Sequence, residues 1–239
     1  MARSISVVEY KVQQAHFFLQ RITDAGSDLF AVQCYTDAFA SAARSVTFSM
    51  QAVIKEIHGF EPWYMRRVEL LKEDRIARFF NDYRVASTHI GDTVVRGASS
   101  SRAADGTLTV LYSFIPISDL PSVPHGDVYS ICKGHFTKIL GIVFDAFTEF
   151  LWQLDDRWYY TAEHFVEMGK TVEDAVQELG FPAHWLGASR VPEEEQWRLL
   201  RRTQTTGCQV NDLFQIYLGK TIRGPDEQGY DSRQAPPAP

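Results

Sequence analysis

Cysteine is scarce in this chain of 239 residues, and the three that occur, Cys34, Cys132 and Cys208, lie far apart. None forms a Cys-x-x-Cys pair, and an odd number of cysteines cannot make a complete disulfide framework. No nearby grouping of Cys with His supports a nucleophilic cysteine. We therefore expect reduced thiols that are mostly buried as small apolar side chains.

Long apolar runs are also missing, because charged residues interrupt the stretches that would be long enough to cross a bilayer. Residues 1–20 lack the basic start, apolar core and cleavage site of a secretory signal peptide. These absences predict a cytoplasmic protein with no membrane partner.

Two further absences limit the chemistry of the chain. No glycine-rich phosphate loop occurs, which argues against a P-loop nucleotide enzyme. The histidines show no metal-ligand spacing, and His135 and His164 fall on separate predicted helices with nothing to join them. We therefore expect neither a metal nor another cofactor.

Charge is unevenly distributed along the chain. The formal net charge of −6 argues against a general nucleic-acid coat protein. Residues 62–102 nevertheless hold eight basic and five acidic side chains, whereas residues 149–200 hold four basic and eleven acidic ones. The basic segment is therefore the part of the chain that is suited to contact phosphate.

The first 92 residues have the periodicity of a helical bundle. Apolar side chains recur at threes and fours over residues 6–24, over 29–57 and in two further helices between Glu61 and about His89. The second helix is apolar over much of its circumference, which is typical of a helix at the centre of a bundle or in a dimer interface. Short loops between these helices predict a compact antiparallel bundle for residues 1–92.

The character of the sequence changes after residue 92. Residues 93–124 are predicted to form a β-hairpin with a long mobile tip at 97–106, followed by a loop punctuated by proline. Residues 125–223 are predicted to be helical again and to pack on the first bundle, whereas residues 224–239 can bury little and should be disordered. The predicted fold class is therefore mainly α, an antiparallel bundle with an inserted β-hairpin and additional C-terminal helices. The helices expected in the C-terminal region span residues 128–154, 162–168, 172–179, 193–202 and 210–218.

The most specific chemistry is an Arg and a His five positions apart, Arg84 and His89, in the stretch RFFNDYRVASTHIGD. A guanidinium can hold phosphate oxygens, and an imidazole can move a proton near neutral pH. Together these groups suffice for metal-free cleavage of RNA. A second Arg–His pair, Arg157 and His164, lies in the acidic half without a preceding bundle. Context rather than spacing favours the first pair.

Residues 6–92 resemble the HEPN superfamily of small helical bundles, in which an Arg is followed after four to six residues by a His near the end of the bundle. The resemblance rests on the helix order, on the aromatic approach FFNDY and on Arg84-Val-Ala-Ser-Thr-His89. The residue after the Arg is commonly polar in that family and is Val85 here. Many members are ribonucleases in toxin–antitoxin, CRISPR and other antiviral systems.

The resemblance implies a metal-independent endoribonuclease with Arg84 and His89 as catalytic residues. It also implies a homodimer through the N-terminal bundle, in which both motifs line one groove, and it suggests an antitoxin as a further protein partner. One imidazole would take the proton of the 2′-hydroxyl of RNA, and the other would protonate the leaving 5′-oxygen. Arg84 would offset the charge on the phosphorane, and the product would carry a 2′,3′-cyclic phosphate. DNA would not be cleaved, because it lacks the 2′-hydroxyl nucleophile.

Helical geometry sets a condition on this mechanism. Five residues along a regular helix turn through about 500°, so the side chains of Arg84 and His89 point about 140° apart. Either the backbone between them is irregular, or two copies of the chain supply a shared cleft. A purely structural interpretation also stays open, in which Arg84 pairs with Asp82 or Asp92 and His89 lies at the negative pole of the helix.

Three further side chains are candidates for binding substrate. Asp37 and Arg44 are polar positions on the otherwise apolar second helix, and Arg78 belongs to the basic segment. Asp37 and Arg44 either face the same groove as the motif or are buried residues satisfied by their neighbours. Arg78 either contacts phosphate or is solvated helix surface.

Two functions compete with the nuclease. One is a catalytically inactive helical-bundle protein that mediates protein–protein assembly through its long second helix and its acidic half. The other is a helical domain that binds a small ligand.

Overall fold

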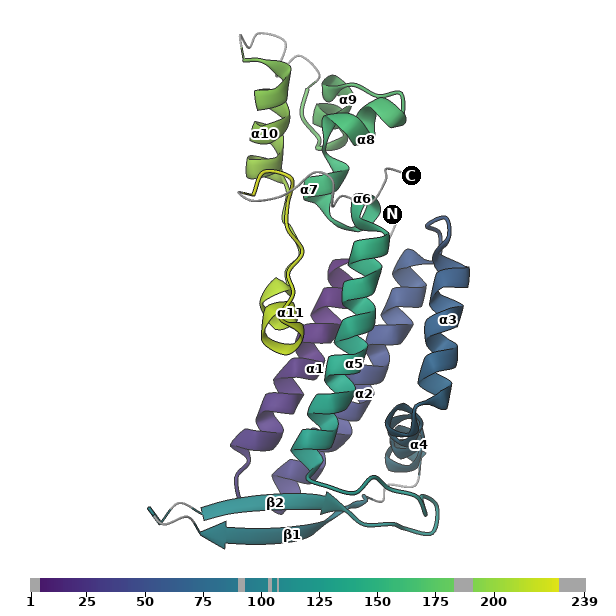
Figure 1. The fold of residues 1–239 in the computed structure, drawn as a ribbon, viewed down its shortest axis with the longest axis vertical. Coiled ribbons are helices and arrows are strands. Elements are labelled where there is room, and N and C mark those ends of the chain that lie inside the picture. The colour runs from purple at the N-terminus through teal and green to yellow at the C-terminus, as the bar shows by residue number, and fades with distance from the viewer. Residues whose placement is uncertain (1–4, 90–92, 103–104, 107, 183–190, 228–239) are drawn as a thin grey trace. The chain divides into compact units, whose positions relative to one another are not determined.

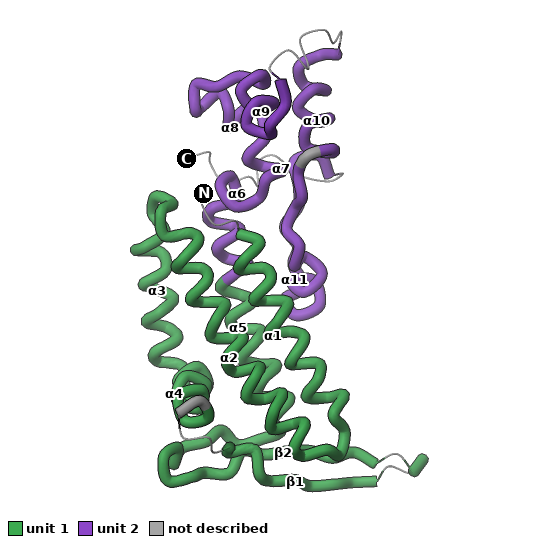
Figure 2. The backbone as a smooth tube through the Cα atoms, turned by 180° about the vertical axis from the view of Figure 1, so that it is seen from behind, with its two compact units in different colours: residues 1–142 green, residues 143–239 purple. Residues whose placement is uncertain are grey.

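The computed structural model describes residues 5–89, 93–102, 105–106, 108–182 and 191–227, except for the side chains of Thr88, His89 and Gln204. The described part is mainly helical and contains a two-stranded antiparallel sheet, which confirms the predicted mainly-α class. Contacts divide the chain into two compact units, residues 1–142 and residues 143–239 (Figure 2). Each unit is described by itself.

Helices α1 (Ser6–Asp24) and α2 (Leu29–Ile54) pack side by side in unit 1 (Figure 1). The carboxylate of Asp28 begins α2 by accepting a hydrogen bond from the backbone N–H of Ala31 at 3.0 Å. The predicted helix over 29–57 therefore starts as expected but ends three residues early, shortly before Gly59 with its φ of 81°. The buried apolar residues of α1 repeat every three or four positions, as the sequence predicts, and they are Val8, Val12, Ala15, Leu19 and Ile22.

Helices α3 (Phe60–Glu73) and α4 (Arg75–His89) are separated by a single residue, Asp74. Its carboxylate accepts hydrogen bonds from the backbone N–H groups of Ile76 and Ala77, each at 2.9 Å, and also contacts the ammonium group of Lys138. One side chain thus begins α4 and ties it to a later part of the chain. The two helices match the third and fourth helices of the predicted bundle.

Strands β1 (Val95–Arg102) and β2 (Leu108–Phe114) form an antiparallel hairpin that lies across the end of the unit 1 helices (Figure 1). The prediction of a mobile tip over residues 97–106 is wrong for residues 97–102, which belong to β1. These small and polar residues pair in register with β2, from Ala98 opposite Tyr112 to Arg102 opposite Leu108. Pairing with β2 overrides the preference of these residues for turns, because strand propensity depends strongly on context.

Helix α5 (Val128–Glu149) begins in unit 1 and ends in unit 2. The predicted helix over 128–154 is interrupted at Phe150, whose φ of −116° and ψ of 36° separate α5 from α6 (Leu151–Leu154). The apolar pattern does not reveal this break, because buried apolar residues, such as Phe147 and Leu151, lie on both sides of it.

Unit 2 continues with short helices. They are α7 (Asp156–Tyr159), which the sequence did not predict, α8 (Ala162–Glu167), α9 (Val172–Glu178), α10 (Glu193–Gln204) and α11 (Asn211–Leu218). The last four agree with the predicted helices to within two residues at each end. A cluster of buried side chains holds α8, α9 and α10 together, and it contains Phe165, Val172, Ala175, Val176, Trp197 and Leu200.

Residues 224–227, the start of the tail predicted to be disordered, make the contacts described below. Residues 228–239 lie outside the described part. No described helix is both long enough and apolar enough to span a membrane.

Candidate functional site

The two motif residues, Arg84 and His89, both lie on α4. The backbone is α-helical from Arg75 to His89, and this includes the segment between the two motif residues. Positions five residues apart on a regular helix lie about 140° apart around its axis. The side chain of His89 lies outside the part that the structure describes. The arrangement in which two copies of the chain supply a shared cleft stays a prediction.

Arg84 is half-buried, and its Nε atom is buried without a hydrogen-bond acceptor. No ion pair joins it to Asp82 within the described ranges, and Asp92 falls outside them. Burial of a guanidinium is costly unless the group finds an acceptor or an anion. Arg84 therefore has hydrogen-bonding capacity that its described neighbours do not use.

Arg44 on α2 interacts electrostatically with Arg84. Its Nη1 donates a hydrogen bond to Thr47 Oγ1 at 3.0 Å, and its guanidinium lies 4.1 Å from the ring centroid of Phe48. The Nε atom of Arg44, like that of Arg84, is buried without an acceptor. Burial lowers the pKa of Arg44, and the neighbouring charge of Arg84 lowers it further, while Tyr64 acts in the opposite direction. The two guanidinium groups thus repel each other electrostatically, and no described carboxylate pairs with either.

Asp37, the third α2 candidate, is engaged elsewhere. Its carboxylate accepts a hydrogen bond from the hydroxyl of Tyr83, a fully buried residue of α4. Burial raises the pKa of Asp37, and the hydrogen bond from Tyr83 offsets part of that rise. This contact matches the interpretation in which a neighbour satisfies Asp37, and it fixes α2 against α4.

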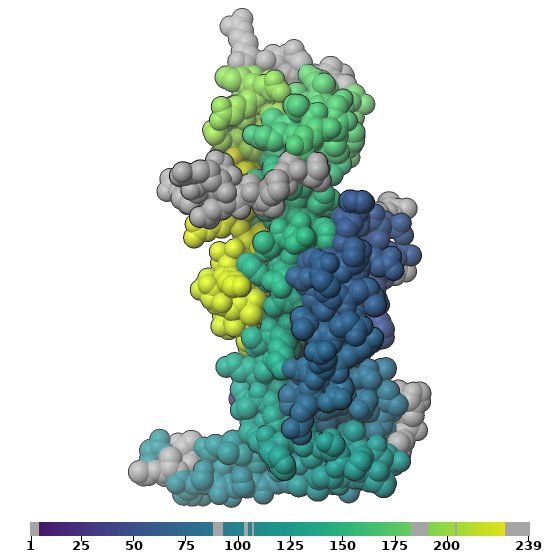
Figure 3. Space-filling model, turned by 45° about the vertical axis from the view of Figure 1, so that its right-hand side comes forward, coloured from purple at the N-terminus to yellow at the C-terminus, as the bar shows by residue number. Residues whose placement is uncertain are grey.

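A cavity of about 340 Å³ lies between α2, α3, α4 and α5, and we call it the α2–α5 cavity. Figure 3 shows the side of unit 1 on which α3 and α5 lie next to each other. The cations that line the cavity are Arg44, Lys72 and Arg78, and the lining carboxylate is that of Asp82. The structure thus brings together two of the predicted substrate-binding residues, Arg44 and Arg78. Neither Asp37 nor Arg84 is among the lining residues.

His135 on α5 also lines the cavity, and sequence reasoning missed it. Its ring stacks on that of Phe80 with centroids 4.5 Å apart, and 6% of the residue is exposed. Its Nδ1 atom is buried and has no hydrogen-bond partner. Burial lowers the pKa of His135 to about 4, so the imidazole is neutral at pH 7. The sequence contained no signal for this position, because Phe80 and His135 are brought together only by the fold.

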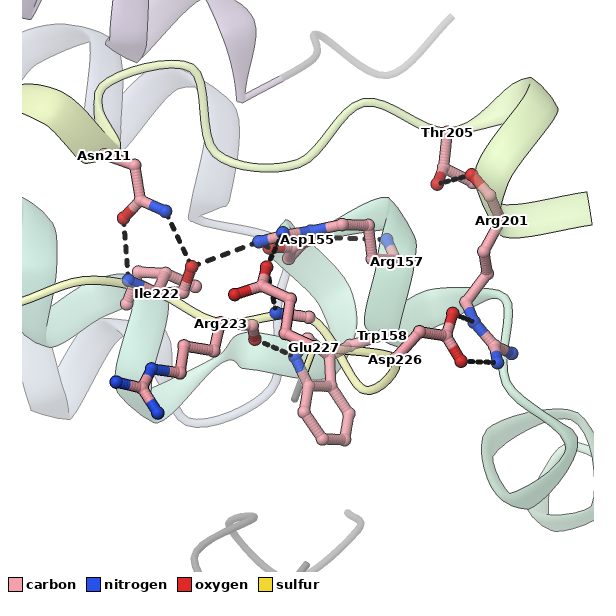
Figure 4. A network of polar contacts seen from close by, with 11 residues as sticks. Asp155, Arg157, Trp158, Arg201, Thr205, Asn211, Ile222, Arg223, Asp226 and Glu227 are labelled. Atoms are coloured by element: carbon pink, nitrogen blue, oxygen red, sulfur yellow. Dashed lines mark hydrogen bonds and ion pairs between the residues drawn. The ribbon is translucent and has the colours of Figure 1, made fainter. Parts of the chain in front are cut away.

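The competing pair consists of Arg157 and His164 in unit 2, and Figure 4 shows Arg157 among its polar contacts. The Arg157 guanidinium donates to the buried carboxylate of Asp155 at 2.7 Å and to Glu227 at 2.6 Å. It also donates to the backbone carbonyl of Ile222 at 3.2 Å. His164 is buried and stacks on Trp152 with ring centroids 5.7 Å apart. This second match to the motif therefore presents no unpaired guanidinium for a ligand.

No group of three or more His, Cys, Asp or Glu side chains in the described part is arranged to hold a metal ion. Comparison of the chain with protein-family models, with curated proteins and with solved structures gives no match.

Proposed function

We propose that this protein is a metal-independent endoribonuclease of the HEPN type that acts in a toxin or antiviral defence setting. The observation that carries the proposal is the pair of guanidinium groups of Arg44 and Arg84, each with a buried Nε that lacks an acceptor. Two cations that feel each other's charge and have no described carboxylate partner favour an anion with several oxygens, such as a phosphodiester.

The regular helix between Arg84 and His89 makes a homodimer part of the proposal. Two copies of α4 that face each other supply two guanidiniums and two imidazoles to one groove. One imidazole accepts the proton of the 2′-hydroxyl as its oxygen forms a bond to phosphorus. The bond from phosphorus to the 5′-oxygen breaks, and the second imidazole protonates that oxygen. Arg84, together with Arg44, stabilises the charge on the phosphorane.

The test is cleavage of single-stranded and structured RNA in EDTA, with the product ends mapped. We expect products that end in a 2′,3′-cyclic phosphate and no cleavage where the 2′-hydroxyl is replaced by hydrogen. His89→Ala should lower the rate about a hundredfold or more, as expected when a general acid–base group is lost. Arg84→Ala should produce a loss of similar size.

Two matched variants control for nonspecific effects. His58→Ala changes an exposed histidine away from α4, and Arg75→Ala changes an exposed arginine at the other end of the same helix. Both should cleave at the wild-type rate. Cleavage that is equal in wild type and His89→Ala would refute the proposal, as would an active protein that is strictly monomeric at the assay concentration.

A second candidate function, protein assembly without catalysis, is favoured by large exposed aromatic side chains on unit 1. The exposed fraction is 59% for Tyr10, 50% for Phe17 and 74% for Phe30. Exposed aromatic residues are enriched where proteins contact one another. RNA that is left intact by a protein that forms a stable complex with a second protein would support this function over the nuclease.

A further inference from the structure

The α2–α5 cavity has the composition of a ligand site rather than of a packing defect. Its volume of about 340 Å³ falls at the lower end of the range that small-molecule sites occupy. Cations line part of it, and the remainder is formed largely by apolar side chains such as Ala40, Leu71 and Ile139. Such a combination suits a ligand that carries both a negative charge and a flat apolar surface.

The charged part of the cavity has a net positive charge. Lys72 is paired with Glu69 at 2.8 Å, but Arg78 makes no ion pair within the described residues. Arg44 likewise retains a buried Nε without an acceptor. Asp82 is the lining carboxylate, and it accepts a hydrogen bond from Asn81 at 3.3 Å. Two guanidiniums are therefore available for an anion, and guanidinium geometry is well matched to phosphate.

The aromatic part of the cavity is the stacked pair of Phe80 and His135, whose ring planes differ by 16°. Aromatic rings in proteins stack on nucleobases, because every base has a π-face. His135 adds a hydrogen-bonding group to the cavity. Its buried Nδ1 has no partner, although buried polar atoms in proteins normally form hydrogen bonds. A neutral imidazole suits an uncharged polar atom, such as a ring nitrogen or a carbonyl oxygen of a base.

We propose that the α2–α5 cavity binds a nucleoside monophosphate. Its base contacts Phe80 and His135, and its phosphate contacts Arg78 and Arg44. A free nucleotide and the terminal nucleotide of an RNA chain share this chemistry. The inference shares Arg44 with the proposed nuclease but does not depend on RNA cleavage, because it uses neither Arg84 nor His89.

The test is isothermal titration calorimetry of the full chain with AMP, CMP, GMP and UMP, and with adenosine and inorganic phosphate as partial ligands. We expect at least one nucleotide to bind about tenfold or more tightly than either partial ligand, because the two contacts act together. Arg78→Gln should weaken nucleotide binding about tenfold or more, which is the effect of losing a charge-assisted hydrogen bond. Arg75→Gln, on the same helix but outside the cavity lining, should leave binding unchanged.

His135→Phe tests the aromatic part separately, because it keeps a ring against Phe80 but removes both nitrogens. It should weaken nucleotide binding while leaving the affinity for inorganic phosphate unchanged. Circular dichroism checks that this variant folds, and if it does not, the Arg78→Gln and Arg75→Gln pair decides alone. A 5′-phosphorylated dinucleotide distinguishes a free nucleotide from the terminal nucleotide of an RNA chain as the ligand. Tighter binding than that of the mononucleotide indicates an RNA end, and equal binding indicates a free nucleotide.

Three results would overturn the inference. One is the absence of nucleotide binding at millimolar concentration. Another is inorganic phosphate that binds as tightly as any nucleotide, which would show an anion site without a base site. The third is nucleotide binding that survives unchanged in Arg78→Gln, which would place the nucleotide elsewhere. None of these results bears on cleavage by His89, so the failure of this inference and the failure of the nuclease are distinguishable.

Discussion

The hydroxyl of Tyr83 on α4 donates a hydrogen bond to the carboxylate of Asp37 on α2, 46 positions earlier in the chain. Tyr83 is fully buried and Asp37 is half-buried, so the bond lies in the contact between the two helices. It joins the helix that carries the Arg–His motif to the helix that carries Arg44. The geometry of the candidate site therefore depends on this bond.

We expect Tyr83→Phe to lower the free energy of unfolding by about 1–3 kcal/mol, because Asp37 would lose its donor in a partly desolvated place. Urea denaturation measures the change. Tyr10→Phe is the matched control, since that ring is 59% exposed and its replacement should change stability by less than about 0.5 kcal/mol. Equal unfolding midpoints for Tyr83→Phe and wild type would show that the bond does not stabilise unit 1.

His135 should make the stability of the protein depend on pH. Burial lowers its pKa from 6.5 to about 4, with Asp74 raising the pKa and Lys138 lowering it. Between these two pH values the unfolded chain binds a proton that the folded chain does not. The free energy of unfolding should therefore fall as the pH is lowered through this window, by at most about 3 kcal/mol from this residue.

His135→Phe should remove that part of the pH dependence, which is measured by urea titrations at intervals from pH 7 to pH 4. His58→Gln replaces an exposed histidine and should keep the wild-type slope. If His135→Phe retains the full slope, the proton is taken up by other groups, such as His16 and His164, whose pKa values burial also lowers.

Gly207 should not tolerate a methyl group. A Cβ at this position would lie 2.3 Å from Nε of Arg157, and that guanidinium is held by Asp155 and Glu227. We expect Gly207→Ala to destabilise unit 2 by about 1–3 kcal/mol. The matched change, Gly134→Ala, adds a Cβ in open space within α5 and should stabilise by up to about 1 kcal/mol. Thermal unfolding of the two variants should show shifts of opposite sign.

Arg157 itself is expected to be essential for the stability of unit 2. Its replacement by Met leaves the carboxylate of Asp155, which is 1% exposed, without its cation. Breaking a buried pair in this way costs about 3–5 kcal/mol. Arg202→Met, at an exposed position, is the control. Near-equal melting temperatures for Arg157→Met and Arg202→Met would contradict this expectation.

The helices of unit 1 could be predicted because their apolar residues repeat with helical spacing. The α1 face of Val8, Val12, Ala15 and Leu19 is an example, and so is the position of Asp28 directly before α2. The hairpin could be predicted only in part. Its strands extend through serines whose composition indicates a turn, and pairing with β2 is a long-range interaction that composition does not contain.

The candidate site was less predictable than the fold, because its contacts join residues that are distant in sequence. Sequence spacing identified Arg84 and His89, and polarity on an apolar helix identified Asp37 and Arg44. Neither signal showed that Asp37 pairs with Tyr83 or that Arg44 interacts electrostatically with Arg84. His135 had been considered only as a metal ligand. Its role depends on burial and stacking, which exist only in three dimensions.

One arginine side chain joins two stretches of unit 2 that lie far apart in sequence, residues 155–158 and 222–227. Arg157 donates hydrogen bonds to the carboxylates of Asp155 and Glu227 and to the carbonyl of Ile222. The Trp158 indole donates to the carbonyl of Arg223 at 2.8 Å. During synthesis, Asp155 and Arg157 leave the ribosome well before these later partners exist. Unit 2 can therefore complete its folding only after translation has passed Glu227. Until then, the Trp158 indole and the Arg157 guanidinium would lack these later partners and would be accessible to chaperones and proteases.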